Sequence, residues 1–146
     1  MKSPILIKGG FATDDRGYVN FNNSFILKQI KRFYIVQNHK TGFIRAWHGH
    51  RKEKKFVLCV SGAAMIAAVK ISDFKSPKKD QKINKFFLSE RDGSMVYIPN
   101  GYANGFKTLN NKTKLIFFSS ATVRESLKDD FRYNYDYWNP WKDLYR

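Results

Sequence analysis

Short stretches rich in β-branched and aromatic residues recur along the chain, and turn residues separate them. Glycine, asparagine, aspartate or proline stands at most of these breaks, which is typical of β-strands joined by tight turns. The predicted strands cover residues 4–8, 32–37, 43–48, 56–60, 63–71, 84–89, 95–99, 105–109 and 114–121. Only residues 123–131 indicate a helix. The pattern therefore predicts an all-β sandwich or barrel of jelly-roll type.

Two stretches differ from this pattern. Residues 73–82 are rich in lysine, contain a proline and have almost no apolar side chain, so they are predicted to form a loop. Residues 131–141, FRYNYDYWNPW, are so aromatic that this C-terminal tail should pack on the barrel or on a second subunit. No repeat or linker divides the chain, and we expect a single domain over residues 1–146.

The chain carries 27 basic and 12 acidic side chains, a formal charge of +15, which favours anionic partners. The lysines are scattered, without a helix-turn-helix, zinc-finger or RNA-binding signature, so no nucleic-acid partner is expected. No apolar stretch is long enough to cross a membrane and none resembles a secretory signal, which predicts a cytoplasmic protein with no membrane partner. The single cysteine, Cys59, lies in an apolar run and should be a buried, unreactive thiol.

Candidate chemistry is concentrated in residues 42–62, GFIRAWHGHRKEKKFVLCVSG. His48 and His50 alternate across one glycine, so in a strand both imidazoles point to the same face, with Arg45 nearby. Imidazole suits proton transfer near neutral pH and also suits metal binding. A pair of structural histidines inside a barrel that binds but does not react is the alternative.

The spacing of two motifs resembles that of the cupin superfamily. The first motif runs through Gly42, His48, His50, Lys55 and Gly62, and the second through Gly93, Pro99, Gly101 and Asn104. The resemblance implies a double-stranded β-helix, the cupin form of the jelly-roll barrel. Lys55 and Asn104 stand where cupins carry a metal-ligating glutamate and histidine, and an ammonium has no lone pair to donate. We therefore expect no metal and no other cofactor.

Longer phrases resemble one metal-free branch, the dTDP-4-dehydrorhamnose 3,5-epimerase family. They are DDRG at 14–17, RAWH at 45–48, KFV at 55–57 and YIPNGYANGF at 97–106. The His-x-His pair after Arg45, with Tyr34 upstream, is also similar to the dTDP-sugar 3,4-ketoisomerases. Both families imply an isomerase that acts on a dTDP-linked or other NDP-linked 4-keto-6-deoxyhexose for bacterial surface polysaccharides. They also imply a homodimer whose N-terminal strands are shared.

The resemblance and the chemistry of ketones assign the roles. A hydrogen next to a ketone is removed by a base near neutral pKa, and a fixed cation stabilises the resulting enolate. His48 matches the family's base, and Lys55 and Arg45 would hold the enolate or the diphosphate. The candidate catalytic residues are His48, Lys55, His50 and Tyr102, and the candidate substrate-binding residues are Arg16, Arg45, Tyr34 and Asn104. Arg16 is expected to approach the pocket of the neighbouring subunit.

One departure leaves the reaction open. Phe117 falls where the family has a tyrosine acid, so His50, Tyr102 or Tyr34 would have to supply the second proton. Asp143 or Asp136 would have to orient His48. The candidates are a 3- or 3,5-epimerase, a 3,4-ketoisomerase, and a non-catalytic protein that binds a sugar or nucleotide.

Overall fold

The structure, a computed structural model, describes residues 2–142, and almost all of its regular elements are strands. The strands are β1 (Ile5–Ile7), β2 (Gly10–Asp14), β3 (Gly17–Phe21), β4 (Arg32–Val36), β5 (Ile44–His50), β6 (Lys55–Ser61), β7 (Ala63–Lys70), β8 (Ile83–Ser89), β9 (Met95–Ile98), β10 (Tyr102–Thr108), β11 (Lys114–Ser119) and β12 (Phe131–Arg132). A 3-10 helix, η1 (Leu27–Gln29), and a short helix, α1 (Val123–Leu127), complete the elements. The predicted all-β fold is confirmed.

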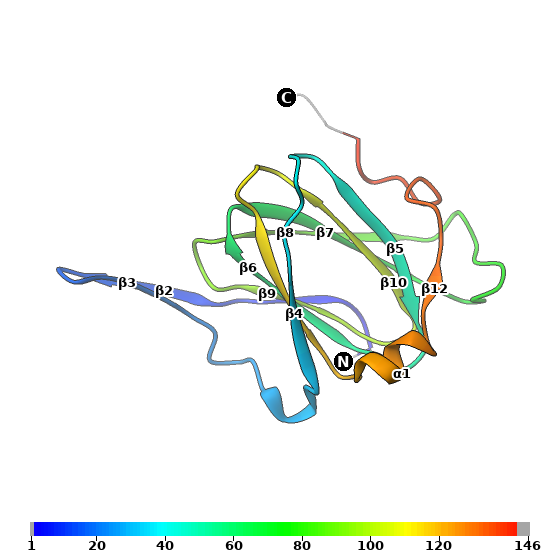
Figure 1. Ribbon diagram of the computed structural model, residues 1–146, viewed down its shortest axis with the longest axis horizontal. Helices are drawn as coiled ribbons and strands as arrows, with labels where there is room; N and C mark the ends of the chain where they lie inside the picture. The colour runs from blue at the N-terminus through cyan, green and yellow to red at the C-terminus, as the bar shows by residue number, and fades with distance from the viewer. Residues whose placement is uncertain (1, 143–146) are drawn as a thin grey trace.

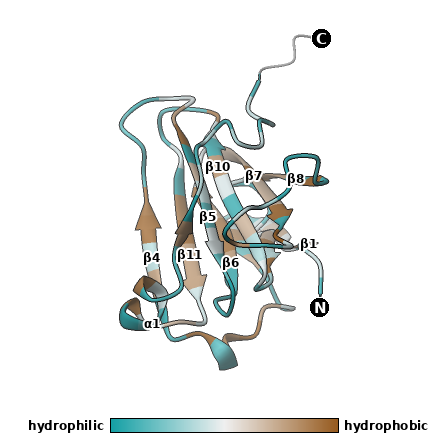
Figure 2. Ribbon diagram, turned by 90° about the vertical axis from the view of Figure 1, so that its right-hand side faces the viewer, coloured by the Kyte–Doolittle hydropathy of each residue, from teal (hydrophilic) through white to brown (hydrophobic). Residues whose placement is uncertain are grey.

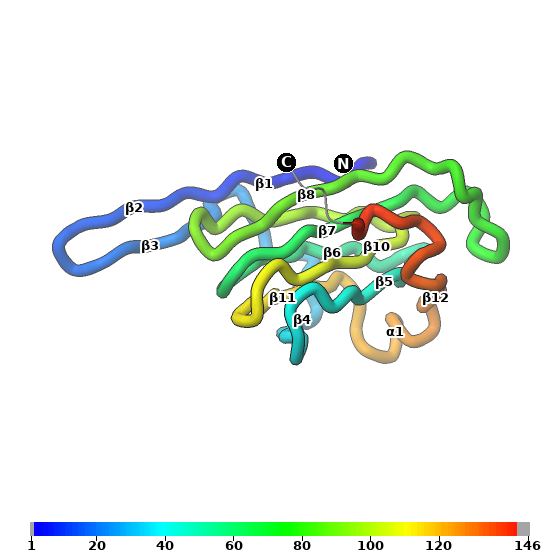
Figure 3. The backbone as a smooth tube through the Cα atoms, turned by 90° about the horizontal axis from the view of Figure 1, so that it is seen from above, coloured from blue at the N-terminus to red at the C-terminus, as the bar shows by residue number. Residues whose placement is uncertain are grey.

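Two five-stranded antiparallel sheets pack against each other (Figure 1, Figure 3). The first sheet has the order β1-β9-β6-β11-β4 and the second the order β12-β5-β10-β7-β8. The chain passes from one sheet to the other between β4 and β5, β5 and β6, and β6 and β7, which gives the jelly-roll sandwich. A separate hairpin, β2-β3, extends away from the sandwich (Figure 3).

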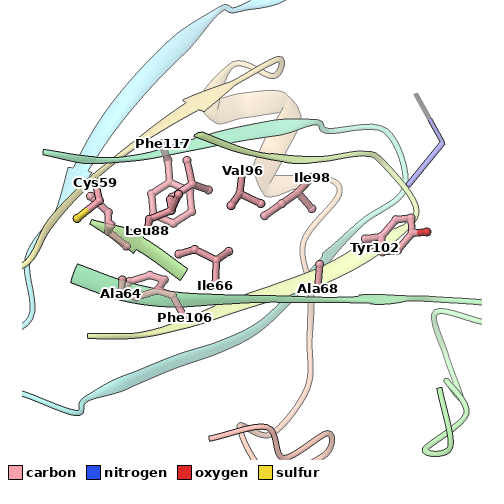
Figure 4. Packing of buried hydrophobic residues seen from close by; sticks show 12 residues of the cluster. Cys59, Ala64, Ile66, Ala68, Leu88, Val96, Ile98, Tyr102, Phe106 and Phe117 are labelled. Carbon is pink, nitrogen blue, oxygen red and sulfur yellow. The ribbon is translucent and has the colours of Figure 1, made fainter. Parts of the chain in front are cut away.

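The space between the sheets is filled by an apolar cluster (Figure 4). Val57, Leu115 and Val96 are fully buried there, and Cys59 is 3% exposed. Burial raises the pKa of the Cys59 thiol to about 11, so the thiol is protonated and unreactive at neutral pH. The prediction of a buried thiol is confirmed.

The aromatic tail covers the outer face of the second sheet. Trp138 and Trp141 pack on Trp47 of β5, whose indole N–H donates to the Tyr135 and Trp138 carbonyls at 3.0 Å. The indole N–H of Trp138 donates in turn to the carbonyl of Lys78, in the lysine-rich loop. This second core confirms that the tail packs on the barrel, and it fixes which face of β5 points outward.

The helix is shorter than the sequence suggests. Residues 123–131 were expected to be helical, but α1 ends at Leu127 and residues 131–132 pair with β5 as strand β12. Thr122 and Glu125 form a capping box at the start of α1. No helix among residues 2–142 is long and apolar enough to cross a membrane.

Candidate active site

A cavity of about 450 Å³ opens between the two sheets, beside β4 and β5. Its lining residues are Tyr34, Val36, Ile44, Arg45, Ala46, His48, Lys55, Asn104, Phe106, Phe117 and Arg132. Five of the eight predicted site residues are among them: His48, Lys55, Arg45, Tyr34 and Asn104. The tertiary structure therefore gathers in one cavity residues that come from four different strands.

His48 reaches the cavity because of the alternation along β5. Gly49 faces the outer aromatic layer, where a Cβ atom would lie 2.6 Å from Ile71 Cδ1 and 3.3 Å from Tyr133 Cε2. A larger residue there would have to displace the end of the Ile71 side chain. Because side chains alternate along a strand, the imidazoles on either side of Gly49 both turn to the opposite face. The amide of Asn104, on the paired strand β10, donates to the His48 carbonyl at 3.1 Å and fixes the backbone.

The imidazole of His48 is oriented by an aspartate that the sequence analysis missed. His48 Nδ1 lies 3.4 Å from Asp130 Oδ1, and Arg132 Nε donates to Asp130 Oδ2 at 2.8 Å. Asp136, one predicted partner, is exposed and separate from this contact, and the other, Asp143, lies outside the described residues. Only the pairing of β12 with β5, which sets Arg132 opposite His48, brings Asp130 close.

These contacts set the protonation of the pair. Burial lowers the pKa of His48, and the hydrogen bond to Asp130 offsets this only in part. Burial alone would raise the pKa of Asp130, but the hydrogen bonds from Arg132 and His48 outweigh it and the pKa is lowered. At neutral pH the carboxylate is charged and the imidazole neutral. Because Nδ1 faces Asp130, Nε2 is the nitrogen free to accept a proton from a ligand.

The charge of the cavity wall is positive. Lys55, Arg45 and Arg132 line it, and none of its lining residues is acidic. The Lys55 side chain is 8% exposed, at the start of β6, and its ammonium lies 5.9 Å from the centre of the Tyr34 ring. Arginine pairs well with phosphate oxygens, and three cations around one open cavity favour a ligand with two or more negative charges.

Tyr34 supplies the one phenolic hydroxyl among these lining residues. It lies on β4 directly opposite Phe117 on β11, and the two rings stack with centroids 5.1 Å apart and an angle of 2°. Phe117 has no proton to donate. His48 belongs to one sheet and Tyr34 to the other, so a base and a hydroxyl face the cavity from different walls.

The other predicted catalytic residues lie outside the cavity lining. His50 is 4% exposed, with Nδ1 2.7 Å from the Asp129 carbonyl. Burial and the charge of Lys55 lower its pKa. The proton of neutral His50 therefore lies on Nδ1, facing an acceptor of the protein itself. Tyr102 belongs to the apolar cluster, with its hydroxyl 3.4 Å from the Lys2 carbonyl.

Arg16, predicted to bind substrate, lies at the end of the β2-β3 hairpin and pairs with Asp14. It lines a separate hollow on the hairpin itself. Its predicted role, in the pocket of a neighbouring subunit, stays a prediction, as do those of His50 and Tyr102.

The residues in the cupin ligand positions do not fit a metal. Lys55 offers an ammonium, and Asn104 uses its amide N–H on the His48 carbonyl. Among residues 2–142, no group of three or more histidine, cysteine, aspartate or glutamate side chains could hold a metal ion.

Solved structures with the same fold include epimerases and a ketoisomerase. A dTDP-4-dehydrorhamnose 3,5-epimerase from Sulfolobus tokodaii matches with a TM-score of 0.74 and 25% identity, over 93% of this chain and 80% of the other. The rmlC epimerase of Mycobacterium tuberculosis gives 0.72 and 20% identity, over 88% and 67%. A 3,4-ketoisomerase from Thermoanaerobacterium thermosaccharolyticum, in complex with TDP-4-keto-6-deoxyglucose, gives 0.68 and 20%, over 94% and 91%.

No curated protein sequence matches the chain. A family model, by contrast, covers nearly all of it: the model described as dTDP-4-dehydrorhamnose 3,5-epimerase matches residues 2–138. The family predicted from the sequence motifs is thereby confirmed. The chain belongs to the dTDP-4-dehydrorhamnose 3,5-epimerase family.

Proposed function

We propose that the protein epimerises a nucleotide-linked 4-keto-6-deoxyhexose, at C3 or at C3 and C5. The observation that carries the proposal is the arrangement of His48 and Tyr34 on opposite sheets, across one cavity with three cations in its wall. A sugar ring between the sheets would have a base on one face and a hydroxyl on the other. This is the geometry that inversion of a carbon centre requires.

The reaction follows from these positions. His48 Nε2 takes the proton from the carbon next to the ketone, and the electron pair of the broken C–H bond forms the enolate. The Lys55 ammonium stabilises the negative charge on the enolate oxygen. Tyr34 donates its hydroxyl proton to the opposite face of the same carbon, which inverts the centre. Exchange with water then returns a proton to Tyr34 and removes one from His48.

The substrate's diphosphate would be held by Arg45 and Arg132, which line the cavity beside His48. A TDP-linked keto sugar is the ligand of the related ketoisomerase structure, and the positive wall here suits the same class of molecule. The sugar would serve surface polysaccharides, and we place the enzyme in the cytoplasm, where nucleotide sugars are made.

Deuterium exchange tests this function. The protein should incorporate deuterium from D2O into dTDP-4-keto-6-deoxyglucose at C3, or at C3 and C5, with inversion, as followed by NMR. Proton abstraction at carbon requires such exchange because the base equilibrates with solvent. Bound dTDP without any exchange would contradict an enzymatic role and would leave the binding protein as the correct interpretation.

A 3,4-ketoisomerase is the second candidate, and Phe117 favours it. If Tyr34 does not reach the opposite face, the proton taken by His48 can return only from the same side. Delivery of this proton to C4, together with transfer of the C3 hydroxyl proton to the C4 oxygen, moves the ketone from C4 to C3 without inverting C3. In the same NMR experiment this reaction gives a 3-keto sugar.

We also propose a homodimer. The edge strand β4 is largely hydrophobic (Figure 2). Phe33 and Ile35 on this strand are 64% and 59% exposed. The projecting hairpin exposes further apolar residues, Phe11, Tyr18 and Val19. Apolar side chains at an edge and on an extended hairpin favour association with a second copy, in which the hairpin could carry Arg16 to the partner's cavity.

Light scattering at micromolar concentration should give twice the chain mass of 17.1 kDa. Phe33→Glu should shift the protein towards monomer because it places a charge in the apolar interface. Phe87→Glu is the matched control, since Phe87 is also 64% exposed but lies on β8, the edge of the other sheet. A folded wild-type monomer would contradict the proposal.

A further inference from the structure

A carboxylate is buried behind the cavity wall, although it touches no part of the cavity itself. Glu53 lies in the loop between β5 and β6, and its side chain is 0% exposed. The carboxylate of Asp129 holds this loop by accepting hydrogen bonds from three consecutive backbone N–H groups, those of Arg51, Lys52 and Glu53. The backbone that carries Glu53 is therefore fixed.

The oxygens of Glu53 are surrounded by hydrogen-bond donors and cations. They contact the hydroxyls of Ser119 and Ser126 at 2.6 and 2.7 Å, His50 Nδ1 at 3.2 Å, Arg32 Nη2 at 3.7 Å and Lys55 Nζ at 3.9 Å. Burial alone would raise the pKa of Glu53, but the charge of Lys55 and the hydroxyl of Ser119 outweigh it, and the pKa is lowered. The carboxylate is ionised at neutral pH.

Glu53 is the carboxylate that pairs with Lys55. An ammonium buried without a counter-ion is strongly unfavourable, and such a group loses its proton or moves into solvent. The Tyr34 ring and the neutral imidazoles of His48 and His50 supply no counter-charge to Lys55. Arg32, which shares the Glu53 carboxylate and the Tyr34 ring with Lys55, adds a second positive charge. The position of the Lys55 ammonium in the cavity wall therefore depends on Glu53.

We propose that Glu53 is a positioning residue, which holds the Lys55 ammonium in place in the cavity wall. The inference rests on the proposed function, in which Lys55 stabilises the enolate. Glu53 lines no part of the cavity and so does not touch the substrate, and Lys55 is the cavity-lining residue with which it forms an ion pair.

A double-mutant cycle tests this dependence. Glu53→Gln keeps the shape of the side chain and one acceptor oxygen, and it should lower kcat at least tenfold while KM and the Kd for dTDP change less than threefold. In a Lys55→Met background the same substitution should have no further effect on kcat. Effects that multiply in the double variant would overturn the proposal. Glu90→Gln is the matched control and should leave kcat unchanged, because the Glu90 carboxylate lies in the turn between β8 and β9 and accepts from the Gly62 N–H.

A second readout needs no catalysis. A buried, paired ammonium exchanges its protons slowly, so Lys55 of the wild type should give a 15N–1H ammonium signal in NMR, and Glu53→Gln should abolish it. An unchanged signal would overturn the inference, even if the protein proved to be no isomerase. Absence of deuterium exchange in the wild type, with the signal lost in Glu53→Gln, would instead contradict only the proposed function.

If Glu53→Gln does not fold, a second variant tests the same contact. Ser126→Ala removes one donor to Glu53 and should weaken both the Lys55 ammonium signal and kcat.

Discussion

Replacing His48 by asparagine is expected to slow proton exchange by about 10²–10⁴-fold, the range that a positioned general base contributes. Asparagine fills similar space but has no basic nitrogen. Because Arg45 and Arg132 remain in the cavity wall, dTDP binding measured by calorimetry should stay within a few-fold of the wild type. His39→Asn is the matched control, since His39 is exposed on the loop after β4 and should leave the rate unchanged.

The same assignment fixes the pH dependence. A general base works only when it is unprotonated, and burial lowers the pKa of His48 from its ordinary value of 6.5. The acidic limb of the wild-type kcat/KM profile should therefore have its midpoint below pH 6.5. Normal turnover by His48→Asn, or an acidic limb with its midpoint above pH 6.5, would show that His48 is not the base.

Lys55→Met should lower kcat by about 10²–10³-fold, the loss found when one electrostatic donor to an oxyanion is removed. Methionine has a similar length and suits the buried site, where Lys55 is 8% exposed. The buried Glu53 keeps two serine hydroxyls and Arg32 as partners, so the fold should survive, and thermal unfolding checks this. The substrate KM should change little because the effect is on the enolate.

Lys54→Met provides the control for charge. It removes the same charge one position earlier, and Lys54 lies outside the cavity lining. A rate loss of similar size in both variants would mean that the overall positive charge of the protein stabilises the enolate, and that Lys55 has no specific role.

The sequence determined the fold class and much of the site. Alternating strands and turn residues specify a β-sandwich because the period of two and the turn chemistry are local properties. The spacing of His48 and His50 also placed both imidazoles on one face, since that follows from strand geometry alone. The two motifs indicated the cupin superfamily, and the longer phrases at 14–17, 45–48, 55–57 and 97–106 identified the family. Five of the residues predicted from these resemblances line the cavity.

The partners of these residues were decided by the tertiary structure. Asp130 reaches His48, 82 positions away in the chain, only because β12 pairs with β5, and two adjacent residues were too short a strand for any sequence pattern to reveal. The outer aromatic layer likewise decided which face of β5 is available for chemistry. The burial and pairing of Glu53 depend on Ser119, Ser126 and Arg32, which come from distant segments and are not neighbours in the sequence. Sequence order fixes local geometry, whereas charge pairing and burial arise only when remote strands come together.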